Sequence, residues 1–432
     1  MPTWVSAGRS IAVNSASNRD RGYHMYADHT ILQTVGQLLI AFLFLATGLI
    51  NVTTKFKQHL DRMVAIGVPF ARFALILGFA MHLMQLRPGQ ADATDFLKSA
   101  LSEPEKQWLD ACLAIDPEAL LDRHRYSLPD WLDQALRATW SDPAEFRLMA
   151  QSLMETAPLD LRVNTYTDRR DDVQHELQLL GLSSQPTPYS PWGLRVQGRP
   201  ALNRTDAFAR GAIEVQDEGS QLLAALLDPK RGEMVVDFCA GAGGKTLALG
   251  ALMRSTGRLY AMDTSAHRLD ALKPRLARSK LSNVHPSVIA HERDERIKRL
   301  YGKIDRVLVD APCSGLGTLR RNPDLKWRQD LQSVAEMQVR QQAILASASQ
   351  LLKPGGRLVY ATCSVLPTEN EEVVAAFDAQ HPRFKPLPAV EVLQALKIPH
   401  SEDLCSADGR FLRLWPHRHA TDGFFASIWQ AA

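Results

Sequence analysis

The fold of this chain is decided by the stretch MVVDFCAGAGGKT, which occupies residues 234–246. Residues 234–238 form a largely apolar run of the kind that makes a buried parallel strand. The glycines that follow let a ligand approach the backbone closely where the next helix opens. Two other glycine motifs are excluded, since a phosphate-binding P-loop needs glycine in place of Cys239 and the dinucleotide fingerprint needs its third glycine in place of Thr246.

The sequence around this stretch repeats the same order of strand and helix. From about Glu214 to the end, the alternation predicts an α/β domain with a mostly parallel, doubly wound sheet. The next strand, residues 257–263, ends in Asp263, whose carboxylate can accept hydrogen bonds from both ribose hydroxyls of an adenosine. A helix N-cap is the structural alternative for Asp263. The pattern is typical of a class I, Rossmann-like fold that binds S-adenosylmethionine, and Asp294, after the third strand, is a further candidate near the adenine.

Two cysteines lie in motifs that each follow a further short strand. Cys313 belongs to DAPCSG, residues 310–315, and Cys363 belongs to YATCS, residues 360–364. Ligands of open α/β sheets bind outside the carboxyl ends of the strands, so we expect both thiols to face one active site. The chain has five cysteines, widely scattered, which argues against a disulfide framework and indicates a reducing compartment. No cysteine and histidine cluster has zinc-ligand spacing, so we expect no metal.

The charge of the chain limits how it could meet a nucleic acid. The formal net charge is only +3, so a nucleic-acid footprint must be a local patch. Basic residues gather on a predicted helix and again just after the first cysteine motif: His267, Arg268, Lys273, Arg275, Arg278 and Lys280, then Arg320, Arg321, Lys326 and Arg328. A solvated helix face is the alternative interpretation of such clusters.

The length of the chain predicts two to four domains. Residues 1–24 are polar and lack periodicity, as in a disordered arm. Residues 25–86 are an apolar helical segment, within which residues 30–54 carry no charge and are long enough to span a bilayer; a buried helical hairpin is the alternative. Residues 87–150 have a helical pattern. Residues 151–213 form a small α/β unit, with strands expected at 159–164 and 193–196 and a helix at 170–180, and residues 214–432 form the catalytic unit.

Together these motifs resemble the Sun/Nop family of RNA cytosine-5 methyltransferases, and within it the RsmB-like group that acts on small-subunit ribosomal RNA. The resemblance includes the sequence PTENE at 367–371 and runs from about Arg87 to the end. It implies a cytoplasmic, monomeric enzyme that uses S-adenosylmethionine, takes RNA as its partner and binds that RNA through residues 151–213. It assigns cofactor binding to Cys239, Ala240, Gly241, Ala242, Gly243, Gly244, Lys245, Asp263, Asp294 and Asp310.

The chemistry implied by the resemblance needs both cysteines. Carbon 5 of cytosine is a poor nucleophile, and a thiolate that adds to carbon 6 turns the ring into an enamine able to attack a methyl sulfonium. The family assigns this attack to the second cysteine, here Cys363, and assists release with the first, here Cys313. Asp310 is similar to the residue that hydrogen-bonds the N3 edge of the base. Two alternatives stay open: a DNA cytosine-5 methyltransferase with Cys313 as the nucleophile, and a membrane-tethered RNA-binding protein without turnover.

The chain departs from the family pattern at two places. Ala242 stands where the family usually has proline, which makes the glycine loop less rigid without removing a hydrogen-bond donor. At the amino terminus, residues 34–86 resemble half of a small DoxX-type membrane protein instead of the helical RNA-docking domain of the NusB type. This departure admits membrane contact through residues 30–54 and an inner-membrane tether, a gene fusion or a mispredicted start.

Overall fold

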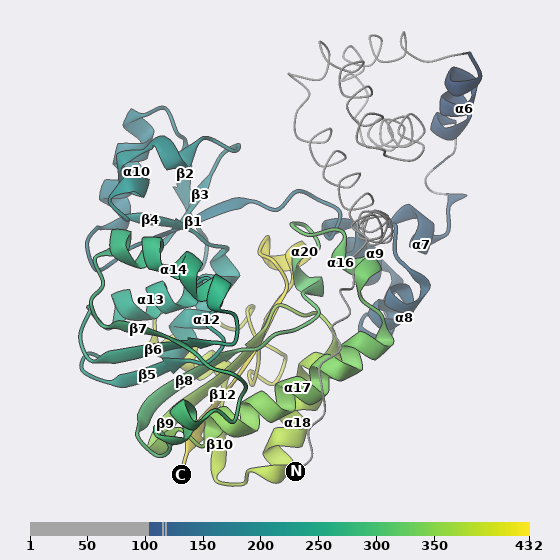
Figure 1. Cartoon of the computed structure of the whole chain (residues 1–432). Coiled ribbons are helices and arrows are strands. Elements are labelled where there is room, and N and C mark those ends of the chain that lie inside the picture. Colours follow the sequence, from purple (N-terminus) through teal and green to yellow (C-terminus); the bar gives the residue numbers. More distant parts are fainter. Residues whose placement is uncertain (1–102, 115, 117–118) are drawn as a thin grey trace, which may run out of the picture. The chain divides into compact units, whose positions relative to one another are not determined.

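The structure of the protein is a computed structural model that describes residues 103–114, 116 and 119–432 (Figure 1). The predictions for the arm at 1–24, for the apolar segment at 25–86 and for residues 87–102 lie outside this part of the chain. The chain divides into two compact units, residues 1–121 and 122–432, and the first contributes helix α6 (Glu103–Leu113). Within the described residues, no helix is long and apolar enough to cross a membrane.

Three helices open the second unit, in the region whose sequence predicted helices. They are α7 (Asp122–Arg125), α8 (Asp130–Thr139) and α9 (Pro143–Ser152). Helix α9 begins where the side chain of Asp142 accepts a hydrogen bond from the backbone N–H of Ala144, with proline in the first turn. Helices α8 and α9 bury residues such as Leu132 and Phe146 in one cluster with Leu316 and Val365, which follow the two cysteines. Helices α8 and α9 therefore pack against the two loops that follow the cysteines.

The small α/β unit follows. Its elements are β1 (Leu159–Val163), α10 (Arg170–Leu179), β2 (Ser184–Pro186), β3 (Gly193–Val196), η3 (Leu202–Arg204), α11 (Asp206–Ala209) and β4 (Ile213–Val215). The strands pair antiparallel in the order β2-β3-β1-β4. The predicted strands and helix are confirmed, and the short β2 was not predicted. The limits of the domains drawn from the sequence stay predictions.

The catalytic unit is built on a sheet with the order β10-β12-β9-β8-β5-β6-β7, with β11 paired to β12. Its elements are α12 (Glu218–Leu227), β5 (Met234–Asp237), α13 (Gly244–Leu252), β6 (Arg258–Asp263), α14 (Ala266–Ser279), β7 (Val284–Val288), α15 (Glu295–Lys298), β8 (Ile304–Asp310), η4 (Leu316–Thr318), α16 (Leu325–Arg328), α17 (Leu331–Ser349), β9 (Leu352–Thr362), η5 (Pro367–Glu369), α18 (Glu371–Gln380), β10 (Phe384–Leu387), α19 (Ala389–Ala395), β11 (Leu412–Leu414), α20 (Pro416–His419) and β12 (Phe424–Ala431). Strands β5 to β9 are parallel, whereas β12 runs antiparallel to its neighbours. The predicted doubly wound α/β class is confirmed.

Helices cover both faces of this sheet (Figure 1), because successive strand residues point to opposite sides. Val235 packs into the cluster under α12 and α13, and the next residue, Val236, packs into the cluster under α17 and α18. In the register between β8 and β9, Asp310 lies beside Ala361. The two cysteine motifs therefore leave the sheet side by side, at the carboxyl ends of neighbouring strands.

Candidate active site

The structure brings the two predicted cysteines together. The sulfurs of Cys313 and Cys363 lie 3.4 Å apart, and either thiol can donate a hydrogen bond to the other. The loops can approach this closely because Gly317 lies between them: its N–H donates to the carbonyl of Cys363 over 2.8 Å. A Cβ atom at this glycine would lie 2.8 Å from that carbonyl oxygen and 2.1 Å from the carbonyl oxygen of Gly423. No larger residue fits there.

The two thiols have different electrostatic surroundings. The hydrogen bond with Cys363, burial and the charges of Cys363 and Glu369 raise the pKa of Cys313 well above its ordinary value. On the other side lies Lys245, whose ammonium is 2.7 Å from Oδ2 of Asp310. Burial lowers the pKa of Lys245, but the charge and hydrogen bond of Asp310 and the charge of Cys363 outweigh it, so the net pKa is raised. Lys245 therefore brings a positive charge close to the Cys363 sulfur.

The glycine loop of residues 239–245 joins β5 to α13. Gly243 has φ +83°, and a Cβ there would lie 2.2 Å from a methyl carbon of Leu272, so glycine is needed for both reasons. Gly241 has φ +54° and nothing within 4 Å of where its Cβ would be, so the loop backbone borders open space there. The carbonyl of Ala242 accepts a hydrogen bond from Arg275 over 2.5 Å. This contact stabilises the loop at the position where the family has proline.

Asp263 connects the glycine loop to the end of β6. Its Oδ2 accepts from the backbone N–H of Gly241 over 2.8 Å, and its Oδ1 accepts from the backbone N–H of Ser265 over 2.7 Å. Helix α14 is capped by the side chain of Ser265, so Asp263 is not the N-cap residue of this helix. Asp263 is 7% exposed and stands beside the loop, and its contact with a cofactor stays a prediction.

Asp237 was quoted in the sequence motif but received no role. It is fully buried at the end of β5, and its Oδ2 accepts from the hydroxyl of Thr246 over 2.6 Å. Its Oδ1 has no hydrogen-bond partner among the described residues. Burial raises the pKa of Asp237 to about 7, although the bond from Thr246 opposes the shift. A carboxylate directly before a glycine loop was the sequence signal for this residue.

Asp294 forms no hydrogen bond with the glycine loop, Asp263 or Asp237 among the bonds that the structure shows for it. It is the N-cap of α15, where its Oδ1 accepts from the N–H of Arg296 over 2.8 Å and its Oδ2 accepts from the N–H of Ala290 over 2.9 Å. These bonds lower the pKa of Asp294. Both carboxylate oxygens thus serve the backbone, and a contact of Asp294 with the cofactor stays a prediction.

Many of the arginines in the basic clusters take part in internal ion pairs. Arg275 and Arg278 pair with Glu214, and Arg321 pairs with Asp217 and Asp422. Lys326 differs, because burial lowers its pKa to about 8 and no carboxylate of the described residues forms an ion pair with it. It lies beside Trp327, which is 59% exposed. This part of α16 is the better candidate for contact with an RNA strand.

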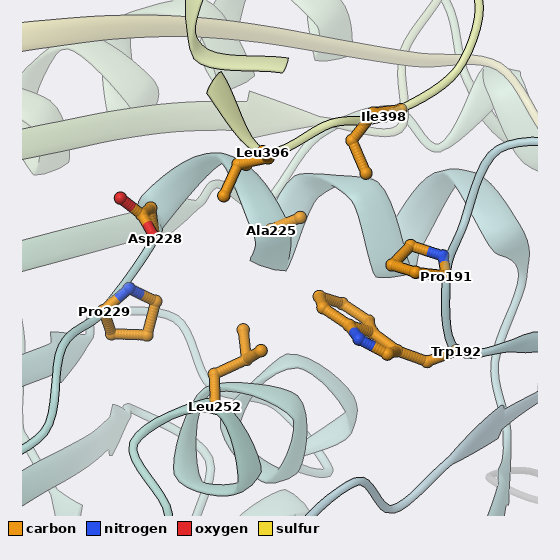
Figure 2. Close-up of a pocket in the computed structure, with 8 residues that line it drawn as sticks. All are labelled: Pro191, Trp192, Ala225, Asp228, Pro229, Leu252, Leu396 and Ile398. Atoms are coloured by element: carbon orange, nitrogen blue, oxygen red, sulfur yellow. The ribbon is translucent and has the colours of Figure 1, made fainter. Parts of the chain in front are cut away.

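A cavity of about 200 Å³ lies elsewhere in the molecule. Figure 2 shows Leu396 and Ile398 facing Leu252 and Trp192 across it. Its wall also includes Asp228, which follows α12 and precedes β5, so the cavity lies at the amino ends of the strands. The cysteines, Asp263 and the glycine loop lie at the carboxyl ends. The cavity is therefore separate from the candidate active site.

Comparison with known proteins agrees with this geometry. The family model for 16S rRNA methyltransferase RsmB/F matches residues 224–430, and the RsmF/B-like ferredoxin-like domain matches residues 128–203. A probable ribosomal RNA small subunit methyltransferase B from Synechocystis sp. is 36% identical, over 72% of this chain and 68% of the relative. The corresponding protein from Bacillus subtilis is 30% identical, over 80% of this chain and 75% of the relative.

Solved structures share the fold. A methyltransferase homologue from Pyrococcus horikoshii is 27% identical with a TM-score of 0.62, over 74% of this chain and all of the other. NSun6 from the same organism, solved with SFG, is 21% identical with a TM-score of 0.61, over 70% of this chain and 98% of the other, and shows the fold alone. The sheet and its carboxyl-edge loops define a class I methyltransferase. Within that class, the chain belongs to the RsmB/F family of 16S rRNA methyltransferases, as the motifs predicted.

Proposed function

We propose that this protein transfers a methyl group from S-adenosylmethionine to carbon 5 of a cytosine in RNA, through a covalent bond between Cys363 and the base. The observation that carries the proposal is the 3.4 Å separation of the Cys313 and Cys363 sulfurs, next to the ion pair of Lys245 and Asp310. Two thiols at this distance can act on neighbouring ring carbons of one base. The names of the relatives favour small-subunit ribosomal RNA as the substrate.

The residues of the glycine loop fit the cofactor. Open space beside Gly241 leaves its backbone accessible, and the buried Asp263 carboxylate stands next to it as an acceptor for ribose hydroxyls. The unpaired Oδ1 of Asp237 is a further buried acceptor at the same place. Bound S-adenosylmethionine supplies an electrophilic methyl group on a sulfonium. We assign its binding to residues 239–245, Asp263, Asp294 and Asp310.

The first step is the addition of the Cys363 thiolate to carbon 6 of the cytosine. The positive charge of Lys245 lies near this sulfur and can stabilise negative charge at the reacting atoms, because charges interact strongly in a buried site. A proton shared between Asp310 and Lys245 would bond the N3 edge as negative charge builds on the ring, and it would return to the pair when the C5–C6 double bond is restored. The electron pair of the resulting enamine would then form the bond from carbon 5 to the methyl group, while the S–CH3 bond breaks and its electron pair stays with the cofactor sulfur as a neutral thioether.

The second step returns the enzyme to its starting state. A base removes the hydrogen from carbon 5, the electron pair of that bond restores the C5–C6 double bond, and the C6–S bond breaks to release the Cys363 thiolate. We assign proton removal to Cys313 in its thiolate form. The hydrogen bond and the charge of Cys363, which raise the pKa of Cys313, are lost once Cys363 is bound to carbon 6, so Cys313 can then release its own proton to solvent and act as the base. The proton then passes to solvent.

Other parts of the chain complete the proposal. Residues 151–213 would bind the RNA beside residues 214–432, which carry the transfer. The thiols of Cys239, Cys313, Cys363 and Cys405 are free, which fits a reducing, cytoplasmic compartment. Bisulfite sequencing of total RNA from a deletion strain would identify the modified nucleotide. Loss of one methylated cytosine in small-subunit ribosomal RNA is the expected result.

The roles of the two thiols are tested by separate alanine variants on a denaturing gel with labelled RNA. Cys363→Ala should form neither adduct nor product, because the sequence stops before addition. Cys313→Ala should methylate once and stay attached to its RNA, because release is blocked. An adduct in Cys363→Ala that is absent from Cys313→Ala would reverse the roles and favour the DNA-type alternative. Absence of any turnover by the wild-type protein would favour the RNA-binding alternative.

A further inference from the structure

Glu369 is a buried acidic residue that the proposed reaction does not use. It ends the short helix η5, which follows the Cys363 loop, and its side chain is fully buried. The sequence analysis quoted it within PTENE but gave it no task. Burial of a carboxylate is costly unless the group is fully hydrogen-bonded. Its hydrogen bonds therefore indicate what it does.

The two carboxylate oxygens of Glu369 accept four hydrogen bonds. Oε1 accepts from the backbone N–H of Ser314 over 2.7 Å and from Nε2 of Gln341 over 3.0 Å. Oε2 accepts from the hydroxyl of Ser314 over 2.5 Å and from the hydroxyl of Ser364 over 2.5 Å. An ionised carboxylate can only accept, and each of these four neighbours has a hydrogen to donate. The group is therefore matched to the charged form.

The donors are placed next to the reacting sulfurs. Ser314 directly follows Cys313, and Ser364 directly follows Cys363. The carboxylate of Glu369 therefore hydrogen-bonds the residue after each of the two cysteines. Gln341 adds a third connection, because its Nε2 also donates to the carbonyl of Pro312 over 2.9 Å. The backbone on both sides of Cys313 is thus fixed relative to the residue after Cys363.

We propose that Glu369 is a positioning residue that sets the separation of the Cys313 and Cys363 sulfurs, so that one base can meet both. The inference rests on the proposed function, since it assigns the two thiols to two steps at one base. An apolar contact would join the loops without the cost of burying a charge. It would not fix the two backbones in one geometry as four directional bonds do, and catalytic groups need such placement. The charge also contributes to the raised pKa of Cys313.

The main test is Glu369→Gln, which keeps the shape of the side chain but turns an NH2 group toward hydrogen-bond donors. We expect the single-turnover rate of adduct formation to fall about 100-fold, as for a misplacement of about 1 Å. The affinity for S-adenosylmethionine, measured by calorimetry, should stay within about threefold, because the glycine loop is not a partner of Glu369. Glu372→Gln is the matched control: Glu372 is exposed and bonds Gln338 and Thr368. Its variant should keep the wild-type rate.

The serine variants test positioning even if Glu369→Gln fails to fold. Ser364→Ala removes the bond on the Cys363 side and should slow adduct formation. Ser314→Ala removes a hydroxyl bond on the Cys313 side and should slow release, so the adduct accumulates on a denaturing gel. A role in folding alone would lower the melting temperature without separating the two steps. Only positioning gives opposite effects on the amount of adduct.

Three outcomes decide the inference. Opposite adduct levels in the two serine variants support it. Wild-type rates in Glu369→Gln, or equal behaviour of both serine variants, would overturn it while leaving the proposed function intact. A wild-type protein that never forms an RNA adduct would instead overturn the proposed function, and with it the inference.

Discussion

The two edges of the central sheet differ in how their charged groups are arranged. At the carboxyl edge, Asp237 and the ion pair of Lys245 and Asp310 lie near the two cysteines; burial raises the pKa of Asp237, and the hydrogen bond with Cys363 together with burial raises the pKa of Cys313. At the amino edge, the cavity is lined mostly by apolar side chains (Figure 2). Asp228, which also lines it, lies within ion-pair distance of Arg306 and Arg357. The charged groups at the carboxyl edge lie next to the candidate reacting thiols. At the amino edge, the charge of Asp228 is balanced by arginines beside an apolar cavity. The same sheet thus separates reactivity from stability.

Lys245→Met should give the largest change, because it removes the positive charge at the carboxyl edge. We expect the single-turnover rate of adduct formation to fall about 10³-fold, the size seen when a stabilising charge or donor is removed from an active site. Some stability should be lost as well, because Asp310 loses its ion-pair partner, so the rate is compared in samples that circular dichroism shows to be folded. Lys280→Met, at the end of α14, is the control. A comparable loss of rate in the control would mean that the reaction depends on the net positive charge of the protein and not on the position of Lys245 at the carboxyl edge.

Asp237→Asn should change how stability depends on pH. The pKa of Asp237 is about 7 in the folded protein, against 3.8 for an ordinary aspartate. The folded state therefore holds a proton that the unfolded state has lost, and stability falls as pH rises from about 4 through 7. The variant should remove a decrease of about 4 kcal/mol. Urea unfolding of both proteins at several pH values measures this, and parallel pH profiles would contradict it.

Arg306→Ala tests the amino edge. The guanidinium of Arg306 is 2.7 Å from Glu233 and donates to the carbonyl of Leu227 over 2.8 Å. Its removal leaves partly buried acceptors without a donor, so we expect a loss of about 2 kcal/mol in the free energy of unfolding. The rate of the folded enzyme should stay the same. A large loss of rate at unchanged stability would break the separation between the two edges.

Asp263→Ala should have the smallest of these effects, confined to the cofactor. We expect S-adenosylmethionine to bind about 10- to 100-fold more weakly, because a buried acceptor and its bond to Gly241 are lost. Asp294→Ala measured beside it by calorimetry tests the second predicted contact. An unchanged affinity in either variant would remove that residue from the cofactor site.

The sequence predicted the parts of the site that depend on strand ends. Cys313, Cys363 and Asp263 each follow a strand of the parallel sheet, and the rule that ligands bind at the carboxyl edge was sufficient to group them. It could not predict Glu369 as a common partner, because a hydrogen bond between residues 55 positions apart depends on the folded loops. For the same reason it could not predict the ion pairs of Arg321, because their partners Asp422 and Asp217 lie far away in sequence. Local sequence patterns predict helices and strands. Which charged side chains form ion pairs depends on contacts between residues that are distant in the sequence.

The position of β12 has a consequence for synthesis on the ribosome. Strand β9, which leads to Cys363, pairs with β12 from Arg357 to Thr362, and β12 comes after the whole stretch 363–423. At about 5–20 residues per second, the ribosome needs roughly 3–12 s to synthesise residues 363–423, and during this time β9 has no β12 to pair with. An unpaired strand edge is a template for association with other chains. The nascent protein therefore passes through a short period in which it is most exposed to aggregation and most in need of a chaperone.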